Sequence, residues 1–131
     1  MINKETENLL FLMQPNLDWN CSCITAATFG KTVEFEVEVA LFTFHPKFDE
    51  SKIKDGEQRL VVGVILRFTN VLSIEPSTFD LEMDGCDDGK VSFGELWNLF
   101  KVAGGYRVVG LQFDIVIDAA DFTLEVLDGF V

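Results

Sequence analysis

Residues 33–41 read Val-Glu-Phe-Glu-Val-Glu-Val-Ala-Leu, so apolar and acidic side chains alternate along most of this stretch. Successive side chains of a β-strand point to opposite faces, so the pattern predicts a strand with one apolar face and one acidic face. We expect this strand to span residues 32–44. The alternation slips at residues 40–42, where both faces become apolar, which predicts either a β-bulge or deeper burial.

Five further stretches have the composition of strands: residues 24–29, 59–69, 78–84, 106–117 and 122–127. The second of them carries apolar side chains on both faces, which predicts a central strand that is covered on both sides. The last two predict a hairpin that turns at residues 118–121, Asp-Ala-Ala-Asp.

Two short helices are expected. Asn3 is a suitable N-cap for a helix over residues 4–13, which should end before Pro15 because the residue ahead of a proline avoids helical angles. Ser92 and Glu95 form an S-x-x-E capping box, which predicts that the second helix begins there and spans residues 92–103. In that segment apolar residues recur at helical spacing, which predicts a core position for Trp97.

These elements predict a mainly β (α+β) fold, an antiparallel sheet or β-sandwich with two short helices. The chain has 131 residues, of which 48% are hydrophobic and 24% charged. Such a length and composition are typical of one globular domain, so we expect a single domain over residues 1–131.

The formal net charge is −12. A chain this acidic repels nucleic acid and anionic membrane surfaces, and it favours a basic protein partner or a cation. The three cysteines have no disulfide-framework spacing, and residues 1–13 do not resemble a signal peptide. We therefore expect reduced thiols and a cytoplasmic location.

Residues 84–95 read Asp-Gly-Cys-Asp-Asp-Gly-Lys-Val-Ser-Phe-Gly-Glu and resemble the calcium loop of the EF-hand family. The resemblance implies that Asp84, Asp88 and Glu95 supply carboxylates and that Lys90 supplies a carbonyl oxygen. Cys86 departs from the family pattern, since a thiol replaces an oxygen ligand. The alternative is a turn at residues 88–89 followed by a helix cap. Calcium is the one possible cofactor; otherwise we expect none.

Acidic residues also form rows that fit a basic partner. Glu34, Glu36 and Glu38 share one strand face, and Asp80 and Glu82 share another. Trp19, flanked by polar neighbours, is the candidate aromatic anchor at the surface. The alternative is that these residues only form solvated outer faces, as charged residues often do on sheets.

Catalytic motifs are missing from the sequence, so we do not expect an enzyme. His45 is the single histidine; an enzyme of unrecognised type would need a concave site around it. Zinc ligation by Cys21, Cys23, His45 and Cys86 does not fit the usual ligand spacing.

Small size, strong acidity, β content and the lack of catalytic motifs make the chain similar to bacterial immunity proteins, which occupy a toxin partner that is often a basic nuclease. Residues 66–71 followed by residues 79–83 also resemble a strand-turn-strand pattern of some small β immunity proteins. The resemblance implies stoichiometric inhibition of a basic toxin, steered by the acidic rows. The alternative function is a calcium-binding module built on residues 84–95.

Overall fold

The computed structural model describes residues 8–53, 59–76, 84–85, 91–111 and 113–130. Within these residues the fold is mainly β: six strands form one antiparallel sheet, accompanied by one short α-helix and a 3-10 turn. The predicted fold class is confirmed. None of the helices in the described part of the chain is long and apolar enough to cross a membrane.

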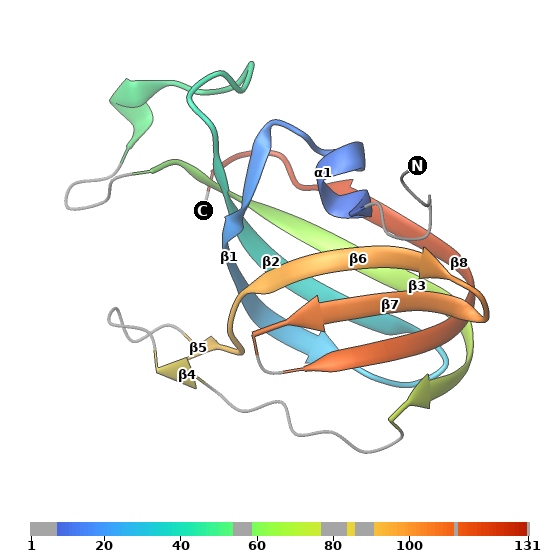
Figure 1. Cartoon of the computed structure of the whole chain (residues 1–131). Helices are drawn as coiled ribbons and strands as arrows, with labels where there is room; N and C mark the ends of the chain where they lie inside the picture. Colours follow the sequence, from blue (N-terminus) through green and yellow to red (C-terminus); the bar gives the residue numbers. More distant parts are fainter. Residues whose placement is uncertain (1–7, 54–58, 77–83, 86–90, 112, 131) are drawn as a thin grey trace.

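The sheet has the strand order β1-β2-β3-β8-β7-β6 (Figure 1). Its strands are bounded as follows: β1 Leu17–Thr28, β2 Val33–Leu41, β3 Val61–Glu75, β6 Leu96–Val102, β7 Gly105–Gly110 and β8 Asp114–Val126. Helix α1 (Leu9–Met13) precedes β1, and the 3-10 turn η2 (Glu50–Lys52) lies between β2 and β3. A separate two-stranded hairpin joins β4 (Asp84–Gly85) to β5 (Val91–Ser92).

The sheet is strongly curled, like half of a barrel, so that its two edge strands approach each other. Ile24 next to that closure donates its N–H to Gly94 O at 2.9 Å and accepts the N–H of Phe93 at 2.7 Å. The concave side encloses the core, where Phe35 stacks on Phe113 with ring centroids 5.8 Å apart and packs edge-on against Phe68. The convex side of the central strands consequently faces solvent.

Strand β2 follows its predicted alternation, and Val39, Ala40 and Leu41 are all buried. The slip in alternation therefore reflects deeper burial, one of the two outcomes expected. Strand β3 is central, as predicted. The prediction that both its faces are covered holds only for the concave face, where the core lies: on the convex face, Gly63 and Ile65 are partly exposed.

Most of the predicted helix over residues 92–103 is instead strand β6, which pairs with β7, and Ser92 belongs to β5. Gly104 and Gly105 lie at the turn of the β6–β7 hairpin. Gly105 has φ 139°, and a Cβ there would lie 2.0 Å from the carbonyl oxygen of Ile117, so the turn requires glycine. The prediction that Trp97 is a core residue is wrong, since its side chain is 37% exposed. Adjacent residues of a strand point to opposite faces, and the neighbouring Leu96 is the one that is buried.

The predicted turn at residues 118–121 is also wrong, since β8 continues through it. Ile117 and Ala119 are buried, Ala120 and Asp121 are both exposed, and alternation then resumes at Phe122. Residues 118–121 therefore mark a point inside one strand at which the alternation of buried and exposed side chains shifts by one residue. At the other end, α1 begins after Asn8, not Asn3, and Asn8 Oδ1 accepts the N–H of Leu10 at 3.1 Å. Residues 4–7 and most of the predicted strand 78–84 lie outside the described residues.

Candidate functional site

Three of the predicted partner contacts lie together on the convex face of the sheet. Glu34, Glu36 and Glu38 alternate along β2 with residues that are fully or almost fully buried. Their side chains consequently point away from the core, as the alternation predicts. Asp80 and Glu82, the other predicted acidic contacts, lie outside the described residues.

Strand pairing extends this row across two further strands. Glu36 lies opposite Ile65 of β3, and Ile65 lies opposite Glu125 of β8. Directly opposite residues of antiparallel strands share a face, so Glu36 and Glu125 flank Ile65. Neighbouring strands lie about 4.8 Å apart, which separates the two glutamate backbones by roughly 10 Å. We call the surface formed by Glu34, Glu36, Glu38, Ile65 and Glu125 the outer acidic face.

One side of the outer acidic face is neutralised within the chain. Arg67 lies opposite Glu34 in the register, and its Nε donates to Glu34 Oε2 at 3.0 Å. By contrast, neither Glu36 nor Glu125 forms an ion pair with any residue that the structure describes. Within the described residues, the negative charge without a counter-charge on this face therefore includes the two carboxylates beside Ile65.

A hollow of about 220 Å³ lies beside these carboxylates. Its lining includes Glu36, Glu38, Ile65 and Leu127. Gly63 also lines it and, having no side chain, leaves the space above the backbone free. A Cβ at residue 63 would lie 3.1 Å from Leu127 Cδ1. An apolar floor with acidic walls fits a lysine or arginine side chain, whose stem is apolar and whose head is cationic.

Sequence reasoning missed the apolar part of this surface. The alternation shows that Gly63 and Ile65 share a face of β3, but apolar residues on both faces of a strand predict that both faces are covered. Nothing local indicates that β8 lies beside β3, so the pairing of Glu125 with Ile65 was also missed.

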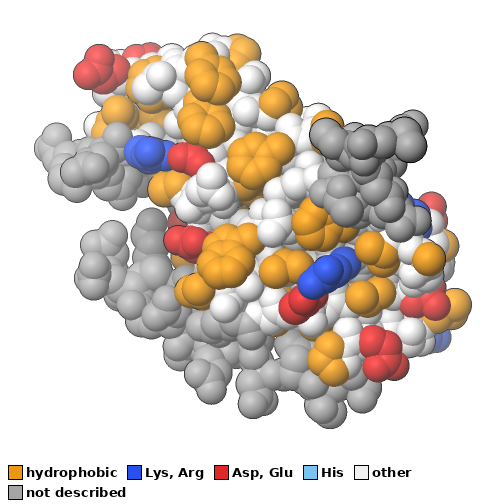
Figure 2. All heavy atoms as spheres, in the orientation of Figure 1, with side chains coloured by type: hydrophobic (Ala, Val, Ile, Leu, Met, Phe, Trp, Pro, Cys, Tyr) orange, Lys and Arg blue, Asp and Glu red, His pale blue; other side chains and the backbone are white. Residues whose placement is uncertain are grey.

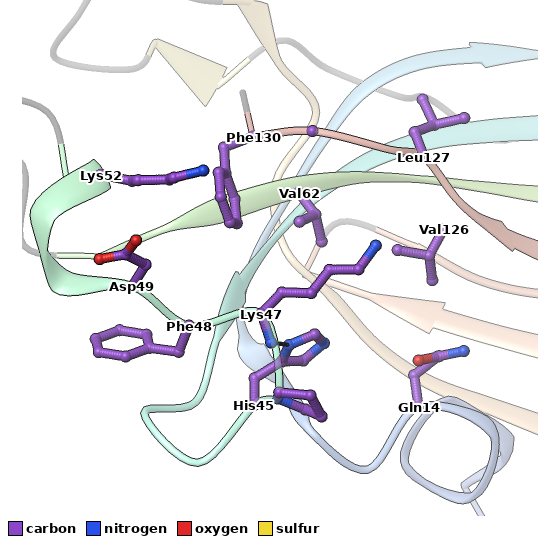
Figure 3. A pocket seen from close by; sticks show the side chains of 12 residues that line it. Gln14, His45, Lys47, Phe48, Asp49, Lys52, Val62, Val126, Leu127 and Phe130 are labelled. Carbon is purple, nitrogen blue, oxygen red and sulfur yellow. Dashed lines mark hydrogen bonds between the residues drawn. The ribbon is translucent and has the colours of Figure 1, made fainter.

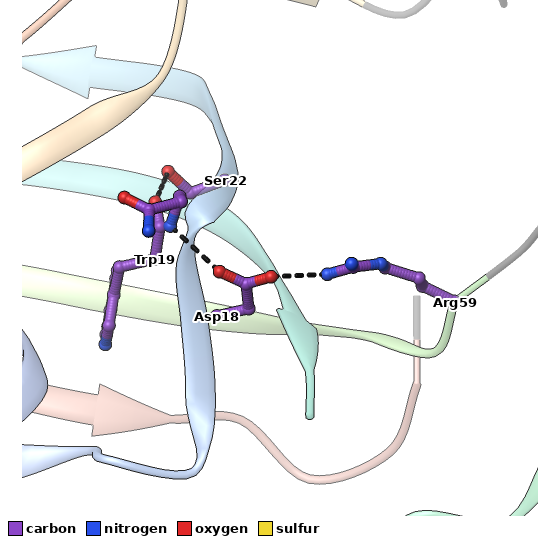
Figure 4. Close-up of polar contacts among 5 residues, drawn as sticks. Asp18, Trp19, Ser22 and Arg59 are labelled. Atoms are coloured by element: carbon purple, nitrogen blue, oxygen red, sulfur yellow. Dashed lines mark hydrogen bonds and ion pairs between the residues drawn. The ribbon is translucent and has the colours of Figure 1, made fainter. Parts of the chain in front are cut away.

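The prediction that Trp19 lies at the surface is wrong. Its side chain is 0% exposed, and Nε1 donates to Gln14 O at 3.2 Å. Ser22 Oγ lies 2.8 Å from the carbonyl oxygen of Trp19 (Figure 4) and accepts the N–H of Leu96 at 3.1 Å. The ring of Trp19 stabilises the core next to the sheet closure and offers no surface to a partner.

The residue before Trp19 is also buried, although it is charged. The Asp18 carboxylate accepts the N–H of Asn20 at 3.2 Å and forms an ion pair with Arg59 Nη1 (Figure 4). The bond to Asp18 raises the pKa of Arg59 above its ordinary value, with a smaller contribution from Cys21. This pair ties β1 to the segment just before β3.

Residues 84–95 are not followed by the helix that follows the calcium loop of an EF-hand. Asp84 pairs with Ser92 in the β4–β5 hairpin, and β6 stands where that helix was expected. Glu95 Oε2 accepts the indole N–H of Trp97 at 2.7 Å. Asp88 and Lys90 lie outside the described residues.

Metal ligation by other residues also finds no support in the described part of the chain, where no three His, Cys, Asp or Glu side chains cluster. Cys21 is exposed and Cys23 is partly buried on β1. Cys86 lies outside the described residues, and Cys21, Cys23 and His45 form no metal-binding cluster among those that the structure describes.

His45 lies in a pocket between the segment that follows β2 and the end of the chain. Its Nδ1 accepts the N–H of Lys47 at 3.0 Å. Partial burial, and next the charge of Lys47, lower the pKa of His45 below its ordinary value, which favours the neutral ring. The position is concave, as an enzyme would need, but a second catalytic group within hydrogen-bond reach of the ring is not found among the described residues.

The side of the molecule that carries β6 and β7 has a different character. Figure 2 shows hydrophobic side chains spread over this side, with single acidic and basic side chains between them. On β7 and β8, Arg107 Nη2 donates to Asp114 Oδ2 at 2.6 Å, so the charge of Asp114 is compensated. This compensated pair therefore differs from the row of glutamates on β2.

No protein-family model, no curated protein and no solved structure matches the chain.

Proposed function

We propose that this chain is a non-catalytic module that binds a basic protein through its outer acidic face, in the way that an immunity protein occupies a toxin. The observation that carries the proposal is the row of Glu36, Ile65 and Glu125 across three paired strands. It places an apolar side chain between two carboxylates that have no ion-pair partner among the described residues.

The chemistry of such a row selects lysine or arginine. The methylene stem of either residue packs on Ile65, and its head then lies between two carboxylates. Arginine suits this position best, because its planar guanidinium donates to carboxylates in pairs. The hollow over Gly63 offers a second contact, because its apolar floor and acidic walls fit another lysine or arginine side chain of the partner.

The net charge of −12 supports the same function. A strongly acidic module attracts a basic partner at long range and raises the association rate, and salt weakens this effect. Stoichiometric inhibition of a basic toxin needs this rapid encounter and no chemistry of its own.

The test compares two double variants of equal charge. Each Glu→Lys exchange raises the net charge by two, so Glu36→Lys/Glu125→Lys and the control Glu50→Lys/Glu75→Lys both change the net charge from −12 to −8. The control residues are exposed and lie outside the outer acidic face. Wild type and both variants are immobilised and exposed to a lysate of the producing cells, and captured proteins are identified by mass spectrometry.

We expect wild type and the control to capture the same basic protein and the acidic-face variant to lose it. With the purified partner, the association rate should fall about tenfold or more in the acidic-face variant. It should also fall in wild type when the salt is raised from about 50 mM to about 300 mM. Capture of the same proteins by all three forms, or of no basic protein by wild type, would falsify the proposal.

A further inference from the structure

A second site of different chemistry lies at one end of the curled sheet. A pocket of about 670 Å³ is bounded by the segment after β2, by the C-terminal residues after β8 and by Gln14 at the end of α1 (Figure 3). Its volume lies within the range of pockets that bury a small organic molecule, which is roughly 300–1,000 Å³.

One part of the pocket wall is apolar. Val62 belongs to the hydrophobic core, and Phe48, Val126 and Phe130 pack against that core from the pocket side. Figure 3 shows the ring of Phe130 and the side chain of Val62 in the middle of the view, with Val126 to one side. This wall can take up the apolar body of a ligand.

The other part of the wall carries two lysines, Lys47 and Lys52, together with the carboxylate of Asp49. Lys52 Nζ lies 5.8 Å from the centre of the Phe130 ring. Lys47 Nζ lies 3.7 Å from Asp128 Oδ1, and both side chains are so exposed that this ion pair is weak. Both ammonium groups therefore retain N–H donors for a ligand.

Two further groups complete the polar lining. His45 Nδ1 accepts the N–H of Lys47, so the neutral ring carries its proton on Nε2, where it is a donor. The carboxylate of Asp49 accepts the N–H and the hydroxyl of Ser51 at 3.0 and 2.7 Å. These bonds hold its negative charge at the start of η2.

We infer that this pocket binds a small organic anion with an apolar body and one carboxylate or phosphate head group. The body packs on Phe130, Val62 and Val126, and the head group accepts hydrogen bonds from Lys47 and Lys52. This site does not depend on the outer acidic face, whose chemistry selects cations.

The test uses calorimetric titration of the full chain with three probes: 3-phenylpropionate, phenyl phosphate and, as the cationic analogue, 3-phenylpropylamine. We expect saturable 1:1 binding of at least one anion, with a Kd on the order of 100 μM, and no binding of the amine. Binding of only one of the two anions identifies the head group. If neither anion binds, or if the amine binds as tightly, the inference is wrong.

Variants locate the site. Lys47→Gln/Lys52→Gln should weaken anion binding about tenfold or more, whereas Lys31→Gln/Lys101→Gln, with the same change of charge, should alter it less than about twofold. Phe130→Ala keeps both lysines and should also weaken binding, because it removes the aromatic wall. Circular dichroism and thermal melting establish that each variant is folded. Equal weakening in both lysine pairs would assign the effect to net charge and overturn the inference.

Discussion

Glu36 lies directly opposite Ile65 in the pairing of β2 with β3, on the convex face of the sheet. An acidic side chain thus stands beside an apolar one that the fold leaves partly exposed. Burial of Ile65 by another protein would release water from its surface, while Glu36 restricts the choice of that protein to basic ones.

This relationship predicts that Ile65→Ser separates binding from stability. The free energy of unfolding should change by less than about 1 kcal/mol, because a partly exposed side chain is lost. The affinity for the basic partner should fall about tenfold, which corresponds to about 1.4 kcal/mol. Urea unfolding and biolayer interferometry measure the two quantities. Leu12→Ser, which changes an exposed leucine of α1, is the control and should leave the affinity unchanged.

The ion pair between Asp18 and Arg59 should matter more for stability than the pair between Glu34 and Arg67. Asp18 is buried, and loss of Arg59 leaves its carboxylate without a counter-charge. Arg59→Met should therefore lower the free energy of unfolding by about 1–3 kcal/mol. Arg67→Met should cost less than about 1 kcal/mol, because its pair is partly exposed.

Urea unfolding at pH 7 compares these two variants. The double variant Asp18→Asn/Arg59→Met should recover part of the loss, since the uncompensated charge is then absent. Equal costs for the two arginine variants would contradict a structural role for the buried pair.

The strands of the sheet could be predicted wherever period-2 alternation coincides with one buried face, as along residues 33–41. The strand within residues 92–103 could not be predicted, because a capping box and helical spacing of apolar residues favour a helix locally. The interactions that decide for a strand are long-range: Phe93 donates its N–H to Ile24 O, and β6 pairs along its length with β7. A local pattern carries no information about these partners.

The candidate site shows the same division. The shared face of Glu34, Glu36 and Glu38 follows from strand periodicity alone. The position of Trp19 does not, because its polar neighbour Asp18 is itself buried through a pairing with Arg59, far along the chain. That compensation appears only after folding has brought the two residues together.

Asp114 provides a prediction about pH. Two hydrogen bonds from Arg107, at 2.9 and 2.6 Å, lower the pKa of Asp114 below its ordinary value of 3.8. A carboxylate with a lowered pKa stabilises the folded state above its unfolded pKa, and this contribution disappears as the pH falls through its folded pKa. Because both side chains are about half exposed, the contribution should be below about 1 kcal/mol.

Asp114→Asn should therefore be less stable than wild type at pH 7, and the difference should vanish as the pH falls through the lowered pKa that Asp114 has in the folded state. Urea unfolding across this pH range measures the difference. Arg107→Gln should show the same pH dependence, since it removes the other half of the pair. A difference that stays constant with pH would assign the effect of the substitution to packing.

The indole N–H of Trp97 donates to Glu95 Oε2, which makes Trp97 a reporter for this carboxylate. Trp19 is fully buried and Trp97 is partly exposed, so the two emit in different environments. Glu95→Ala removes the acceptor and should shift the emission of Trp97 to longer wavelength, without any added metal. Trp97→Phe, which leaves only Trp19, should abolish the shift.

The same reporter distinguishes the two interpretations of residues 84–95. An EF-hand loop closes on calcium with both oxygens of its last glutamate, and here one of them is bonded to Trp97. Since a strand replaces the helix that should hold that glutamate in place, we expect calcium to change neither the Trp97 emission nor the melting temperature. A calcium titration with a magnesium control measures both quantities. A saturable calcium response that is lost in Glu95→Gln would contradict this expectation and would show that Glu95 leaves Trp97 to bind the ion.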